Sequence, residues 1–70
     1  MYATYAKIRD AKGMTDNAVA VATGITQSTI YDWKQRAAKN PRANLSIENT
    51  KKIASYFGVP VDELLKEEEG

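Results

Sequence analysis

Four basic side chains lie within nine consecutive residues that contain no acid: Lys34, Arg36, Lys39 and Arg42. Ammonium and guanidinium groups at this density can neutralise a polyanion, so nucleic acid is the first partner to consider. The formal net charge of +1 hides this asymmetry, because residues 62–70 hold five of the nine acids. Residues 1–61 carry nine basic and four acidic side chains, a net of +5. An ordinary solvated face is the alternative interpretation.

The composition excludes several other chemistries. The chain has no cysteine and no histidine, so thiol nucleophiles, thiolate metal sites, disulfides and imidazole acid/base catalysis are absent. No glycine-rich phosphate loop is present, and we expect neither enzymatic activity nor a cofactor or metal. The chain also lacks a secretory signal and any run of 18 apolar residues, which predicts a cytoplasmic protein without a membrane partner.

Helix start and stop signals recur along the chain, while the alternation typical of strands is missing. This pattern predicts an all-α fold, a compact domain of four or five helices over residues 1–66, followed by a frayed acidic tail at 67–70. Thr15, Thr26 and Ser46 are the expected N-caps. The expected helices cover residues 2–12, 15–23, 26–37, 46–57 and 60–65, with a loop at 38–45.

The third predicted helix has two unlike faces. Ile30 and Trp33 recur at helical spacing and are assigned to the core, and in the helix before it Ala18, Val19 and Ala22 form a face of small residues. Only a short turn with Gly24 joins these two helices, so they must cross steeply. The polar face of the third helix then points outward. A helix of this kind fits the DNA major groove, where amide and hydroxyl groups can read base edges.

Three segments carry a resemblance to a known family. The sequence IRDAKGMT at residues 8–15, the stretch TGITQSTI within residues 20–33, and KIA and YFGVPVDELL within residues 46–65 occur in order. Together they resemble the Cro/phage-repressor-type (XRE-like) helix-turn-helix family over roughly residues 5 to 65. The resemblance implies a lambda-repressor-like DNA-binding domain whose recognition helix runs from Gln27 to about Arg36.

By that resemblance, the DNA base-contacting positions fall on Gln27, Ser28, Tyr31 and Asp32. An amide such as that of Gln27 can bond bidentately to adenine, and the carboxylate of Asp32 can accept from a cytosine amino group. The alternative for Gln27 and Ser28 is a solvated face without a role. Tyr31 could instead pack on a neighbour or on the DNA backbone.

Phosphate contacts are expected from helix N-termini and from the basic loop, because free N–H groups and cations both bind phosphate. The alternative for the loop residues is a mobile, solvated connection. The candidates are Asn17, Thr26, Lys39, Asn40, Arg42 and Asn44.

Several positions differ from the family pattern. Asp16 stands where the family commonly has a glutamine that contacts a DNA phosphate. The negative charge of Asp16 is expected to repel a phosphate, so either Asn17 makes this contact instead or the contact is lost. Lys34 stands where the family has an acid that pairs with the arginine of the first helix, here Arg9, so that ion pair is not expected. The loop at 37–45 is longer than the connection that the family usually has at this place. The extra residues either make a further DNA contact or only add flexibility. Thr50 and Lys51 stand at positions of the fourth helix that are often apolar, so the family's usual dimer or core packing is not expected there.

These observations predict a sequence-specific transcriptional regulator of phage or prophage repressor type, which binds a double-stranded DNA operator. A homodimer is possible, at least when the protein is bound to DNA. Half-sites would lie about 34 Å apart. Val61, Leu64 and Leu65 are candidates for the dimer contact, or they seal the core instead. The rival hypothesis is a protein-interaction adaptor that keeps the fold without binding DNA specifically; Asp16, Asp32 and the acidic tail favour it.

Overall fold

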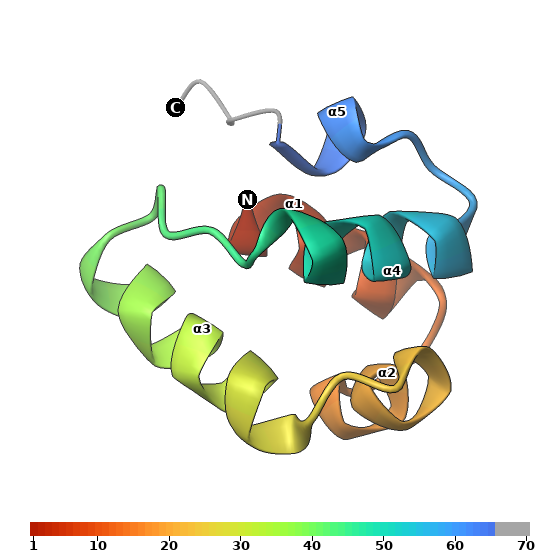
Figure 1. The fold of residues 1–70 in the computed structure, drawn as a ribbon, viewed down its shortest axis with the longest axis horizontal. Helices are drawn as coiled ribbons and strands as arrows, with labels where there is room; N and C mark the ends of the chain where they lie inside the picture. Colours follow the sequence, from red (N-terminus) through yellow and green to blue (C-terminus); the bar gives the residue numbers. More distant parts are fainter. Residues whose placement is uncertain (66–70) are drawn as a thin grey trace.

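The computed structural model describes residues 1–65, and Figure 1 shows their arrangement. These residues form no strand, which confirms the all-α prediction. None of the helices they form is long and apolar enough to cross a membrane. The predicted acidic tail at 67–70 lies outside the described residues. The helices are α1 (Tyr2–Ala11), α2 (Asp16–Thr23), α3 (Gln27–Lys39), α4 (Ile47–Phe57) and α5 (Val61–Leu65).

Side-chain caps start the three central helices, as the sequence predicts. The Thr15 hydroxyl accepts a hydrogen bond from the Ala18 amide at 3.1 Å, and the Ser46 hydroxyl accepts one from the Asn49 amide at 3.2 Å. Thr26 caps α3 in the same way. Each cap satisfies an N–H group that the helix itself leaves unpaired, so the helix boundary follows from local chemistry.

Aromatic rings from α1, α3 and α4 form the centre of the core. Tyr5 and Trp33 are fully buried, and their ring centroids lie 5.0 Å apart. Phe57 also packs against Tyr5, with its centroid 6.2 Å from that of the Tyr5 ring. Leu64 of α5 is also fully buried, and Val61 packs against the same core. These two residues therefore seal the core of their own chain, whereas Leu65 stays 39% exposed.

Two details of the predicted helices are wrong. Ala22 is exposed and Ala20 is buried in its place, because α2 packs against both α3 and α4 and buries Val19 and Ala20 together. The third helix extends to Lys39, so Lys39 lies in the last helical turn and the loop is shorter than the predicted 38–45.

The segment after α3 is fastened to the core. The indole Nε1 of Trp33 donates a hydrogen bond of 2.9 Å to the Ala43 carbonyl, and Ala43 and Leu45 are both buried. A buried indole N–H needs an acceptor, and this carbonyl supplies it. Ala43 and Leu45 therefore anchor this segment to the core.

Thr50 is accommodated inside α4 although its position often holds an apolar residue. It is only 1% exposed, and its hydroxyl donates a hydrogen bond of 2.9 Å to the Ser46 carbonyl one turn earlier. A buried hydroxyl that is hydrogen-bonded carries little penalty. Lys51, the next residue, is exposed and leaves the core unchanged.

Candidate nucleic-acid interface

A tight turn sets the angle between α2 and α3. Gly24 ends α2 with φ at +77°, a left-handed conformation that glycine adopts without strain, and Ile25 is buried beneath the turn. Thr26 then caps α3. Figure 1 shows the two helices next to each other along the lower side of the molecule, joined by this short connection. The geometry leaves the first turns of α3 facing outward.

The four predicted base-contacting residues lie together on the exposed side of α3. Gln27, Ser28, Tyr31 and Asp32 are all exposed, and Tyr31 keeps 64% of its surface accessible. Ile30 lies on the opposite side and is buried, as does Trp33. Because residues 27, 28, 31 and 32 span less than half of the helix circumference, they can address one surface at the same time.

Asp32 has an internal partner that the sequence analysis did not identify. Its Oδ2 accepts a hydrogen bond from Arg36 Nε at 2.9 Å, and the Arg36 Nη1 also donates to the Asn44 carbonyl at 3.2 Å. The spacing of four residues on a helix is a signal that could have revealed this ion pair. Both side chains are largely exposed, so the pair costs little to open.

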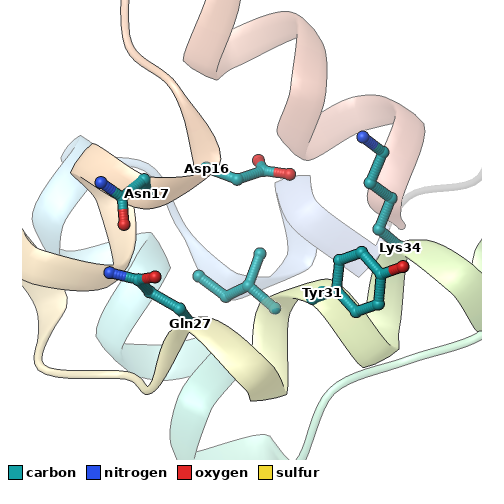
Figure 2. Close-up of a pocket in the computed structure, with 6 residues that line it drawn as sticks. Asp16, Asn17, Gln27, Tyr31 and Lys34 are labelled. Carbon is teal, nitrogen blue, oxygen red and sulfur yellow. The ribbon is translucent and has the colours of Figure 1, made fainter.

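A shallow hollow of about 240 Å³ lies where the start of α2 meets α3. Figure 2 shows the side chains of Asn17 and Gln27 on one side of it, and those of Tyr31 and Lys34 on the other. Ile30 provides an apolar part of the wall, and the sixth lining residue is Asp16. Amide, phenol and ammonium groups from two helices therefore converge on one exposed site.

Asp16 has a structural role that the sequence alone did not indicate. Its Oδ1 accepts hydrogen bonds from the Tyr5 hydroxyl and from Arg9 Nη1, each at 2.6 Å, and its Oδ2 accepts one from the Tyr2 hydroxyl at 2.7 Å. Arg9 thus has an acidic partner on α2, although Lys34 occupies the usual position of the acid on α3. The internal ion pair exists in a relocated form, with Arg9 paired to Asp16 and also to the exposed Asp10.

The protonation states in this network follow from its contacts. Burial favours the neutral form of Asp16, but the hydrogen bonds from Tyr5, Tyr2 and Arg9 outweigh it and hold the pKa of Asp16 below its usual value. Burial, together with the neighbouring Asp16 carboxylate, raises the pKa of Tyr5 well above its ordinary value. Asp16 is therefore ionised and Tyr5 neutral at physiological pH.

The predicted phosphate-contacting residues fall into two groups. Asn17 and Thr26 lie at the starts of α2 and α3, and the Thr26 hydroxyl is engaged in the cap and with the Thr29 hydroxyl at 2.7 Å. The second group surrounds the end of α3, and its four side chains are all exposed. There the Asn40 side chain accepts a hydrogen bond from the Arg42 amide at 3.1 Å and shapes the turn. The second group comprises Lys39, Asn40, Arg42 and Asn44.

Comparison with known proteins agrees with this geometry. A family model described as helix-turn-helix matches residues 6–64, which includes most of α1 and all of α2, α3 and α4. Searches of curated proteins and of solved structures found no match. The matched span contains the turn at Gly24 and the exposed face of α3 described above. The chain therefore belongs to the Cro/repressor-type, XRE-like helix-turn-helix family of DNA-binding proteins.

Proposed function

We propose that this protein is a sequence-specific transcriptional regulator of phage or prophage repressor type that inserts α3 into the major groove of an operator. The observation that carries the proposal is the exposed polar face at the start of α3, with Gln27, Ser28, Tyr31 and Asp32 on one side of the helix. An α-helix of ordinary diameter fits the major groove, where each base pair presents a distinct set of donors and acceptors.

Each of these side chains has a role that its chemistry permits. The Gln27 amide can donate to N7 and accept from the amino group of one adenine, a contact worth roughly 1–3 kcal/mol of discrimination. Asp32 can accept from a cytosine amino group through the oxygen that does not hold Arg36. Phosphate contacts by the residues at both ends of α3 would fix the position of the helix without selecting sequence.

Two copies of the chain on a two-fold-symmetric site would together read a longer DNA sequence than a single recognition helix can. Leu65 is the one of the three predicted contact residues that remains substantially exposed, since Leu64 and Val61 pack on their own core. We therefore assign Leu65 to the contact between copies. A spacing of about 34 Å places both recognition helices on the same side of the DNA.

The test is selection of binding sites from a random pool of duplex DNA, with the parent protein, Gln27→Ala and Arg42→Ala compared over a salt series. The proposal expects an enriched palindromic motif. Gln27→Ala relaxes the preference at one base pair of each half-site, whereas Arg42→Ala weakens binding to all sequences alike. Failure of the parent protein to enrich any motif would contradict the proposal.

A second candidate is a protein-interaction adaptor that uses the same fold. The observation in its favour is apolar surface away from the recognition helix, since Val21 on α2 and Ile47 on α4 are 73% and 60% exposed. Apolar contact with a partner protein resists salt, whereas DNA binding weakens steeply as salt rises. Binding in cell extract that survives a rise from 50 to 300 mM salt, without an enriched DNA motif, would favour this candidate.

A further inference from the structure

Lys34 is an exposed cation on the recognition helix α3, and no acidic side chain within residues 1–65 pairs with it. It follows Gln27 and Tyr31 at positions i, i+4 and i+7, so the three side chains share one stripe of α3. All three line the hollow between α2 and α3, where Figure 2 shows the Lys34 side chain on the same side as the Asp16 carboxylate. Within residues 1–65, Lys34 forms no ion pair.

The nearby carboxylate does not supply the missing partner. Both oxygens of Asp16 accept hydrogen bonds from α1, and the Arg9 guanidinium at 2.6 Å balances its charge. Arg9 also pairs with Asp10, but that carboxylate is 69% exposed and does not line the hollow. Since Asp16 is already paired with Arg9, the ammonium of Lys34 is the one charged group of the lining that forms no ion pair within residues 1–65. The site therefore attracts an anion, although a carboxylate forms part of its wall.

The remaining lining residues indicate what kind of anion fits. Asn17, Gln27 and Tyr31 present groups that can donate hydrogen bonds, and Ile30 presents an apolar surface. A phosphate joined to a deoxyribose has oxygens that match these donors and a sugar that matches the apolar wall. Its size suits a shallow, open volume of about 240 Å³.

We propose that Lys34 binds a backbone phosphate of DNA in this hollow. The contact rests on the proposed function and gives Lys34 a role in it. Until this point, Lys34 was described only as the lysine that replaces the usual acidic partner of Arg9. It also links two unusual positions of the sequence: Asp16 supplies the acid for Arg9, and Lys34 becomes available for DNA. Lys34 in this role selects no base and contributes affinity that depends on salt.

The test is a titration of the selected duplex with the parent protein, Lys34→Gln, Lys34→Arg and the control Lys52→Gln between 50 and 200 mM salt. Lys52 is an exposed lysine on α4 and does not line the hollow. For Lys34→Gln, the slope of log K against log salt falls in magnitude by about 0.9, so its affinity deficit shrinks about 3.5-fold over this range. The base preference stays unchanged, Lys34→Arg restores the slope, and Lys52→Gln matches the parent protein.

An unchanged slope for Lys34→Gln, or loss of preference at one base pair, would overturn the proposal, since the second result identifies a base contact. Thermal unfolding of each variant shows whether the domain is intact. A parent protein that prefers no sequence, yet shows the same slope difference on an arbitrary duplex, would overturn the operator function while supporting the Lys34 contact. The two failures are therefore distinguishable.

Discussion

Replacement of Asp16 by alanine should destabilise the domain strongly, although the residue lies beside the DNA-facing surface. The carboxylate accepts from Tyr2, Tyr5 and Arg9, and the Arg9 side chain is only 18% exposed. A hydrogen bond that involves a charged group contributes about 1.5–3 kcal/mol. Removal of this acceptor leaves the buried Tyr5 hydroxyl without its acceptor, and it leaves the mostly buried guanidinium with only the exposed Asp10 carboxylate and the Tyr2 hydroxyl as partners. We expect a loss of about 3 kcal/mol in the free energy of unfolding.

That loss is large for a domain of this size. Total stability at 0.05–0.15 kcal/mol per residue amounts to roughly 3.5–10 kcal/mol for such a chain. With a shift of about 4–8 °C per kcal/mol, Tm should fall by about 12–24 °C. Circular dichroism at 222 nm during heating, or urea titration, measures the change directly.

A matched control is available on the same arginine. Asp10 also pairs with Arg9, at 2.9 Å, but its side chain is 69% exposed. Exposed ion pairs contribute little, so Asp10→Ala should lower the unfolding free energy by less than about 0.5 kcal/mol. A double-mutant cycle of Asp16→Ala with Arg9→Ala should give a coupling energy above about 1 kcal/mol. Additive single effects, or equal losses for Asp10→Ala and Asp16→Ala, would refute the reasoning.

Three further outcomes follow from the same contacts. The pKa of Asp16 is lowered in the folded state, so the contribution of its carboxylate to the free energy of unfolding is present above a pH of about 4 and is lost as pH falls through the folded pKa. When unfolding is measured from pH 7 to pH 2, the stability of Asp16→Asn should therefore fall less with acid than that of the parent protein. Thr26→Ala removes the cap of α3 and should cost about 1 kcal/mol in urea unfolding, and a cost near zero would mean that the cap hydrogen bonds do not hold α3. Leu64→Ala leaves a cavity at a fully buried position and should lower the free energy of unfolding by about 2–5 kcal/mol. Leu65→Ser should leave the free energy of unfolding nearly unchanged and weaken only the pairing of two copies on DNA, which sedimentation of the complex would show.

Features that depend on neighbours in sequence were predictable. Thr15, Thr26 and Ser46 cap their helices through hydroxyl contacts three residues ahead, and Gly24 ends α2 at a positive φ. The apolar stripe of α3 was predicted for the same reason, because it depends on helical period alone. The exposed polar face of α3 then follows as the opposite side of that stripe.

Features that depend on where distant segments meet were not predictable. Asp16 looked like an obstacle to DNA because its charge is visible in the sequence, whereas its donors on α1 come from residues seven or more positions away. The extension of α3 from residue 37 to Lys39 was missed because the proline at residue 41 suggested an earlier end. Leu64 could have served either in the core or in a dimer, and only its packing decides.

We propose that the exposed face of α3 reads DNA sequence, and one comparison of affinities tests this proposal most directly. The affinity of the parent protein for its enriched duplex should be measured beside that for a scrambled duplex of the same length and composition at 150 mM salt. We predict at least about 10³-fold tighter binding to the enriched duplex, the range typical of specific DNA-binding proteins. Equal affinity for the two duplexes would show that the protein binds DNA through charge alone, and would contradict the assignment of Gln27, Ser28, Tyr31 and Asp32 as base-reading residues.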